Sequence, residues 1–260
     1  MISFKQFFKE ALPGVSPEQE QDVIGRSFKQ NVISDLLAGA SVSDSDFKWG
    51  DCKTCPFQNI CNKATSGNLV PTEDILKDLQ KRVPQIDFKD YIKVDPKSDR
   101  VTIKFNRSGE GGLIHVPAQL NKVLGPIIIL HEIAHKLYSI DMLTSEIVNH
   151  DLASEIFTLA RTIEDVRVEN LMEQEFPGTA SVYKERASVI VPLYKQHTPS
   201  KFAKIVDDLF LFLRGYQKGF SHNPEYVILA KDFIGAGNNR QEKVKAVIAL
   251  AELIYQDLNK

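Results

Sequence analysis

A short stretch of strand-like sequence between two long helical stretches constrains the fold of this 260-residue chain most strongly. Residues 91–94 and 101–105 read as two strands joined by a turn, and residues 113–116 read as a third strand. Elsewhere, apolar residues recur at the spacing of a helix. The predicted helices cover residues 16–37, 72–79, 126–139, 152–173 and 241–258, and two more begin near Thr198-Pro199 and Asn223-Pro224. The pattern predicts an α+β fold that is mostly α, with one small antiparallel sheet.

The charge balance and the lack of long apolar runs limit the partners of the chain. Its 32 Lys and Arg face 34 Asp and Glu, so any role in nucleic-acid binding would need a local basic patch. No apolar run approaches the roughly 20 residues that a membrane span needs. Segment 1–11 contains Lys5, Lys9 and Glu10 and does not resemble a secretory signal. We therefore expect a cytoplasmic protein with no membrane partner.

The sequence His131-Glu132-Ile133-Ala134-His135 lies on the helix predicted after the third strand. Residues i and i+4 share one face of a helix, so both imidazoles can bind a single zinc ion. Glu132 would then be the general base that takes a proton from a zinc-activated water molecule. The alternative reading is two ordinary histidines on a partly buried helix face. The pattern favours zinc binding by His131 and His135 and catalysis by Glu132.

A catalytic zinc typically has three protein ligands, and the helix at 152–173 offers several carboxylates for the third. Glu164 lies on an apolar helical stripe, where a carboxylate needs a partner such as a metal, and it is the favoured ligand. Glu155 is the rival, because it lies 20 residues beyond His135, a spacing seen in thermolysin-like enzymes. Asp165 and Glu169 lie on a more polar stripe. That position suits either orienting an imidazole N–H or exposure to solvent, and Asp165 is a further candidate ligand.

Residues 159–169 read Leu-Ala-Arg-Thr-Ile-Glu-Asp-Val-Arg-Val-Glu, and Phe176-Pro177-Gly178 follows. With the HExxH helix, this run resembles the signature of a family of metallopeptidase-like proteins of bacteriophages. The family is related to the region that precedes the von Willebrand-like domain in cobalt-chelatase-associated proteins. The resemblance covers about residues 90–180 and is more specific than the HExxH pattern alone.

The resemblance implies a zincin-like core of the gluzincin type, encoded by a phage and active in the host cytoplasm. Zinc would be bound by His131, His135 and Glu164, and Glu132 would be the catalytic residue. The resemblance further implies that Arg167 organises the carboxylates by bidentate pairing.

The three cysteines, Cys52, Cys55 and Cys61, fall within ten residues of each other. An odd, clustered trio is a poor disulfide framework and favours a metal site. The spacing is similar to that of cysteine triplets that hold iron–sulfur clusters, although those sites use a fourth ligand. One alternative is a second zinc held by three cysteines and one histidine, and another is three reduced thiols. The candidate histidines are His115, His150, His197 and His222.

We expect three regions along the chain. Residues 1–85 form an N-terminal helical region with the cysteine-containing insert at about 40–67, residues 86–178 form the zincin-like core, and residues 179–260 form a C-terminal helical region that packs on the core. The predicted function is zinc-dependent hydrolysis of a protein or peptide substrate, and residues 113–116 could form the edge strand along which that substrate lies. One alternative is an inactive metallopeptidase-like scaffold or binding protein, and another is an iron–sulfur protein associated with nucleic acid.

Overall fold

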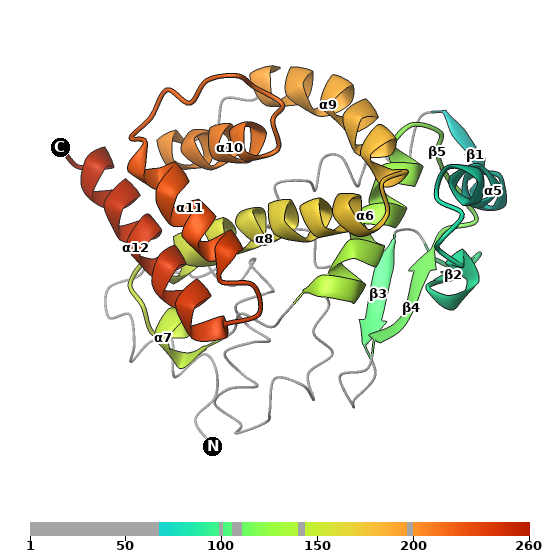
Figure 1. The fold of residues 1–260 in the computed structure, drawn as a ribbon, viewed down its shortest axis with the longest axis horizontal. Coiled ribbons are helices and arrows are strands. Elements are labelled where there is room, and N and C mark those ends of the chain that lie inside the picture. The colour runs from blue at the N-terminus through green and yellow to red at the C-terminus, as the bar shows by residue number, and fades with distance from the viewer. Residues whose placement is uncertain (1–67, 99–100, 106–110, 140–143, 197–199) are drawn as a thin grey trace, which may run out of the picture.

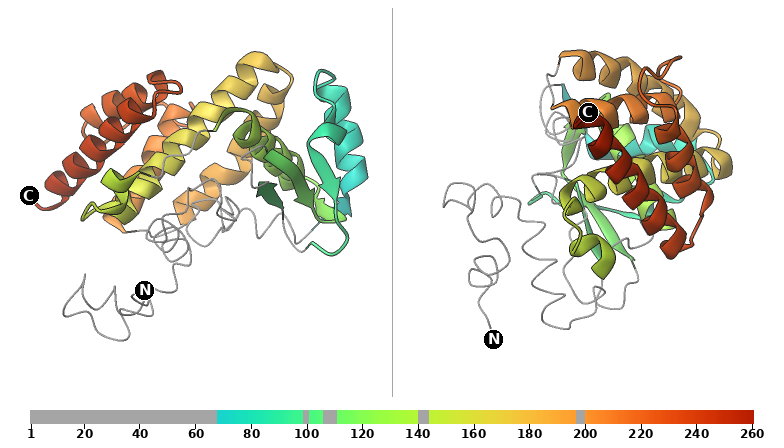
Figure 2. Two further views of the ribbon diagram at one scale, coloured as in Figure 1. Left: turned by 90° about the horizontal axis from the view of Figure 1, so that it is seen from below. Right: turned by 90° about the vertical axis from the view of Figure 1, so that its left-hand side faces the viewer.

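The computed structural model of this chain describes residues 68–98, 101–105, 111–139, 144–196 and 200–260. The helix predicted at 16–37 and the cysteine-containing insert lie outside the described residues. The long helix α8 (Ala153–Glu175) runs through the middle of the molecule. The strands lie towards one end of it and the C-terminal helices towards the other (Figures 1 and 2). The described part is mostly helical, as the sequence predicts.

The strands form two small sheets. In the first, β1 (Leu69–Pro71) pairs antiparallel with β5 (Gln119–Asn121). The second has the order β2-β4-β3, in which β2 (Ile92–Val94) is parallel to β4 (Gly111–Val116) and β3 (Thr102–Phe105) is antiparallel to it. All three predicted strands are therefore present, but the sheet that they form is mixed.

The prediction of an antiparallel sheet is correct for the β1–β5 and β3–β4 pairs and wrong for β2. The strands at 91–94 and 101–105 do not pair with each other; they pair with opposite edges of β4. Ile114 and Val116 of β4 are completely buried, and the β2 pairing sets Ile92 beside Ile114. The strand with completely buried Ile114 and Val116 therefore takes the central position, although it is the last of the three along the chain. Residues 113–116 are consequently not an edge strand for a substrate.

The helix that carries the HExxH sequence is α6 (Leu124–Tyr138), close to its predicted bounds. The side chain of Asn121 accepts hydrogen bonds from the backbone N–H groups of residues 123 and 124, at 3.0 and 3.2 Å, and so caps the start of the helix. Residues 124–130 are all buried. A Cβ on Gly125 would lie 2.7 Å from Cδ1 of Ile75, so α5 (Thr72–Arg82) packs closely against α6.

The other helical elements are η3 (Phe88–Asp90), α7 (Ser145–Val148), α9 (Thr179–Gln196), α10 (Lys201–Leu213), α11 (Glu225–Gly235) and α12 (Arg240–Leu258). The helix expected near Thr198-Pro199 begins instead at Lys201, because Ser200 is its cap and accepts a hydrogen bond from the N–H of Ala203 at 3.2 Å. Asn223 accepts from the N–H of Glu225 at the start of α11, close to its predicted place.

The buried apolar side chains form two clusters, and α8 contributes to both. The first cluster combines α5, α6, the strands, α9, the C-terminal half of α8 and two residues of α10. The second combines the N-terminal half of α8 with α7, α10, α11 and α12. As a result, the eight consecutive residues 162–169 are all buried, and four of them are charged. Within the described residues, no helix is long and apolar enough to cross a membrane.

Candidate metal centre

Two imidazoles lie side by side on the face of α6 that is turned towards α8. His131 and His135 are separated by one helical turn, and their ring centroids are 4.5 Å apart. The side chain of His131 is 14% exposed and that of His135 is 7% exposed. Both rings are therefore largely shielded from water while still reachable from the surface.

Asp165 supplies a carboxylate from α8 to the same place. Its Oδ1 lies 2.9 Å from Nε2 of His135 and 4.0 Å from Nε2 of His131. One ligand atom from each of these three residues lies within 4.8 Å of the others, so the group could hold a metal ion. In the part of the chain that the structure describes, this is the one group of its kind.

The other ring nitrogen of each histidine has its own partner. Nδ1 of His131 lies 2.8 Å from Oε1 of Glu169, and Nδ1 of His135 lies 2.6 Å from Oγ of Ser139 at the end of α6. Because a carboxylate only accepts hydrogen bonds, Nδ1 of His131 must carry the proton of this contact. Its Nε2 then lies on the side of Asp165, 4.0 Å from Oδ1 of that residue.

The surroundings of Asp165 suit a bound cation. The residue is 1% exposed, and its Oδ2 atom is buried without a hydrogen-bond partner among the described residues. Burial disfavours the charged form of His135, but its hydrogen bond to Asp165 and the charge of that carboxylate outweigh this effect and raise the pKa of His135. The site therefore already attracts positive charge between the imidazoles and Asp165.

Glu164, the favoured third ligand in the sequence, is directed elsewhere. It is 1% exposed, as its apolar stripe predicted, but its partners are basic side chains. Arg167 binds it in a bidentate manner at 2.6 and 2.8 Å, and Nζ of Lys243 on α12 lies 2.8 Å from Oε2. Burial alone would raise the pKa of Glu164, but these two cations lower it. The structure thus brings Asp165, and not Glu164, to the histidine pair, because neighbouring helical positions point about 100° apart.

The bidentate pairing implied for Arg167 is confirmed, since both its Nε and its Nη2 bind Glu164. Nη2 also donates to the backbone carbonyl of Tyr138, the last residue of α6. Arg167 therefore connects the end of the histidine helix to α8.

Glu169 is completely buried rather than exposed on a polar stripe, and it orients His131 as the sequence suggested. Arg186 on α9 donates to its Oε1, and Nε of Arg214 lies 3.1 Å from its Oε2 as an ion pair without hydrogen-bond alignment. Burial alone would raise the pKa of Glu169, but the two arginines and His131 hold it well below its usual range. The carboxylate that orients His131 is therefore ionised.

The remaining predicted residues lie at or beyond the edge of this group. Glu132 is half-buried, next to His131, and its charge acts on His135. Glu155 is half-buried in the first turn of α8 and is not part of the candidate metal group. Cys52, Cys55 and Cys61 lie outside the described residues, so their metal site stays a prediction.

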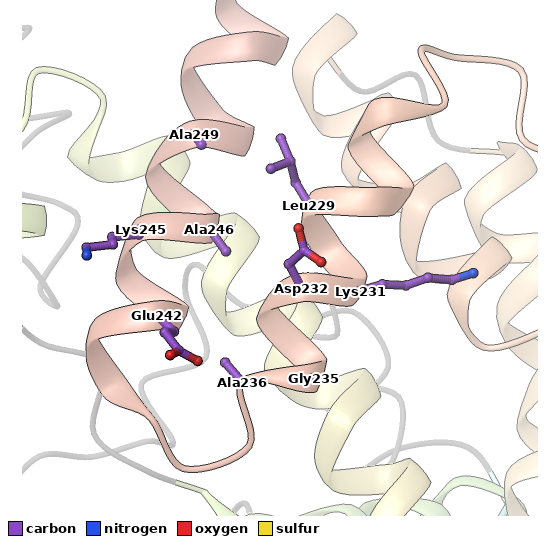
Figure 3. A pocket seen from close by; sticks show the side chains of 9 residues that line it. All are labelled: Leu229, Lys231, Asp232, Gly235, Ala236, Glu242, Lys245, Ala246 and Ala249. Carbon is purple, nitrogen blue, oxygen red and sulfur yellow. The ribbon is translucent and has the colours of Figure 1, made fainter.

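Figure 3 shows a separate pocket of about 540 Å³ between α11 and α12. Both signs of charge and several small residues line it: Leu229, Lys231, Asp232, Gly235, Ala236, Glu242, Lys245, Ala246 and Ala249. None of the three candidate ligands comes from these two helices, and the mixed charges favour no particular class of ligand.

Of the basic partners of the two glutamates, Arg167 was expected, whereas Lys243, Arg186 and Arg214 were not predicted from the sequence. A signal was nevertheless present for Lys243, which shares a helical stripe with Val247, Leu250 and Ile254. Such a cation on an apolar stripe needs a buried anion, just as Glu164 needs a buried cation. Ser139 and Arg214 lie at helix ends, where the helical spacing of apolar residues does not indicate which side chains are buried.

Comparison with known proteins adds no relative: no protein-family model, no curated protein and no solved structure matches this chain.

Proposed function

We propose that this protein is a zinc-dependent metallopeptidase whose zinc is bound by His131, His135 and Asp165. The observation that carries the proposal is the convergence of two Nε2 atoms and one buried carboxylate on a helix with the HExxH pattern. Proteins use imidazole nitrogens and carboxylate oxygens as zinc ligands, and catalytic sites use three of them. The donor set therefore fits zinc.

The contacts behind the ligands support the same assignment. Histidines that bind metals commonly donate their other ring N–H to an oxygen acceptor, and Glu169 and Ser139 are placed to accept here. Oδ2 of Asp165 is a buried carboxylate oxygen without a hydrogen-bond partner in the described segments, a costly state that a bound cation would relieve. Asp165 replaces Glu164 in the ligand set, since Glu164 is neutralised by Arg167 and Lys243.

The reaction that we propose is hydrolysis of a peptide bond. When bound, zinc would lower the pKa of a water molecule and would polarise the substrate carbonyl. Glu132 follows His131 on α6 and is half-buried, so its carboxylate can accept a proton from the attacking water and deliver it to the leaving amine. His135 and Asp165 define the inner wall of the site, where burial excludes competing water.

The decisive variant is Glu132→Gln, which removes the general base and keeps the size of the side chain. We expect it to bind zinc with the affinity of the wild type and to lose peptidase activity by roughly 100-fold or more. Zinc content would be measured by elemental analysis, and activity with labelled casein and a library of fluorogenic peptides. Glu146→Gln, an exposed glutamate on α7, is the matched control and should change neither quantity.

Three outcomes would contradict the proposal. If the wild-type protein contains no zinc, or if its zinc content does not depend on His131 and His135, the proposed metal centre is wrong. If Glu132→Gln keeps its peptidase activity, Glu132 is not the general base and the proposed mechanism is wrong. A zinc-binding protein that cleaves no peptide in either form would favour the scaffold alternative.

A further inference from the structure

Arg214 is a buried arginine that contacts three polar side chains within one turn of α8. It is the residue that ends α10, and its side chain is only 3% exposed. Its Nη1 donates to the side-chain oxygen of Asn170, its Nη2 lies 2.5 Å from Oε1 of Glu173, and its Nε lies 3.1 Å from Oε2 of Glu169. The guanidinium therefore spans one turn of the helix that carries Asp165.

Aromatic rings and a helix-ending turn fix the position of this guanidinium. Its Cζ lies 5.3 Å from the centre of the Tyr183 ring and 5.6 Å from that of Tyr216, distances at which a cation is attracted to an aromatic ring. Gly215 has φ of +69°, and the N–H of Tyr216 bonds to the carbonyl of Leu211 at 2.8 Å, which closes the C-terminal end of α10. The hydroxyl of Tyr216 donates to the carbonyl of Tyr183 at 3.0 Å.

Glu169 connects this arrangement to the candidate metal centre. Arg214 faces its Oε2, and Arg186 donates to its Oε1. Oε1 also accepts the N–H of His131 at 2.8 Å. One carboxylate oxygen thus accepts from Arg186 and the other forms an ion pair with Arg214, so the carboxylate has little freedom to rotate away from the imidazole.

A purely structural role accounts poorly for this network. Removing two guanidiniums and a carboxylate from water is costly, and well-packed apolar side chains at such positions are often equally or more stabilising. What the ions provide and apolar side chains cannot is a directed acceptor for the ring N–H of His131.

We infer that Arg214 is a positioning residue of the metal centre. By fixing Glu169, it holds His131 with Nδ1 protonated and with Nε2 turned towards Asp165. The inference rests on the metal centre of the proposed function and not on peptidase activity. Arg186 assists on the other oxygen, whereas Arg214 also joins Glu169 to Asn170 and Glu173.

The first test measures the dissociation constant of zinc for Arg214→Met in the full-length protein. We expect a dissociation constant at least about tenfold higher than that of the wild type, the lower end of the effects seen when partners of metal-binding histidines are removed. Arg82→Met is the matched control, because Arg82 also binds a glutamate through two nitrogens, at 2.8 and 3.3 Å from Glu185, but on the surface between α5 and α9. It should leave the zinc affinity unchanged. A folded Arg214→Met protein with wild-type affinity would overturn the inference.

The second test gives an answer even if Arg214→Met fails to fold or if the wild-type protein binds no zinc. Arg214→Lys keeps the charge but lacks the planar fork that reaches three acceptors at once. In metal-free protein with ¹⁵N-labelled histidine, NMR reports which ring nitrogen of His131 carries the proton. We expect a protonated Nδ1 in the wild type and in Arg82→Met, and a mixture of tautomers in Arg214→Lys. An unchanged tautomer in Arg214→Lys would overturn the inference, whereas absence of zinc from the wild type would count only against the proposed function.

Discussion

Two neighbouring carboxylates on α8 have opposite surroundings, and this difference determines the composition of the candidate site. Glu164 is enclosed by Arg167 and Lys243, while Asp165 faces His131 and His135. The negative charge of a carboxylate that is already paired with two cations is neutralised, so its attraction for a metal ion is weak. At the scale of the residue, charge pairing therefore separates the candidate ligand Asp165 from its neighbour Glu164.

Asp165→Asn and Glu164→Gln should consequently have different effects. Asp165→Asn removes the charged ligand, and we expect the dissociation constant of zinc to rise by about 100-fold or more. Glu164→Gln should keep most of the zinc affinity but lower the free energy of unfolding by about 3 kcal/mol, because Arg167 and Lys243 lose their buried counter-charge. Zinc titration and urea denaturation of both variants would measure this. Loss of zinc from Glu164→Gln with binding retained in Asp165→Asn would show that Glu164 is the ligand after all.

At the scale of the element, the turn between α8 and α9 determines how α5 is anchored. Phe176-Pro177-Gly178 ends α8, and the backbone at Gly178 passes directly over the end of α5. A Cβ at Gly178 would lie far inside contact distance of the carbonyl oxygen of Arg82. The close approach requires glycine at this position, although its φ is not positive.

Gly178→Ala should therefore push α5 away from the turn. We expect the free energy of unfolding to fall by about 2 kcal/mol, the usual cost of inserting a methyl group into a well-packed contact. Thermal and urea unfolding would measure the change. Gly219→Ala is the control, since a Cβ there meets no atom within 4 Å. Equal stability of the two variants would contradict the packing argument.

At the scale of the whole molecule, α8 joins two apolar clusters. Besides Arg167 of α8 itself, the basic residues that reach its carboxylates come from α9, the end of α10, and α12. The C-terminal helices thus pack against the core and also neutralise its buried acids. Another acid on α10, Asp207, lies outside this network. Burial and the neighbouring Asp208 raise the pKa of Asp207 to about 7, and Lys204 offsets only part of that effect.

The raised pKa of Asp207 predicts how global stability changes with pH. Folding favours the protonated form, so its contribution is fully present below pH 4 and is lost as the pH rises towards 7. Asp207→Asn should raise the free energy of unfolding at pH 8 by about 1–2 kcal/mol, an amount reduced by partial exposure to solvent, and should match the wild type near pH 4. Urea denaturation at both pH values would measure the difference in the free energy of unfolding, with Asp232→Asn at an exposed position as the control. A constant difference between Asp207→Asn and wild type across this range would argue against titration of Asp207.

Four of the long helices and the histidine pair could be predicted from the sequence, whereas β1, β5 and α7 were not predicted. Apolar spacing located α5, α6, α8 and α12 to within a few residues, and the i, i+4 spacing of His131 and His135 placed both imidazoles on one face. These features depend on contacts between residues close in the chain, which the sequence displays directly. The burial of Glu164 followed from its apolar stripe for the same reason.

The pairing of the strands and the partners of the buried charges were decided only by the tertiary structure. β4 became central because Ile114 and Val116 needed burial on a surface assembled from distant segments. Asp165 rather than Glu164 faces the imidazoles because packing on two clusters sets the rotation of α8 about its axis. Lys243 neutralises Glu164 from 79 positions further along the chain. Local sequence fixes which side chains share a helical face, but only the packed molecule determines what that face meets.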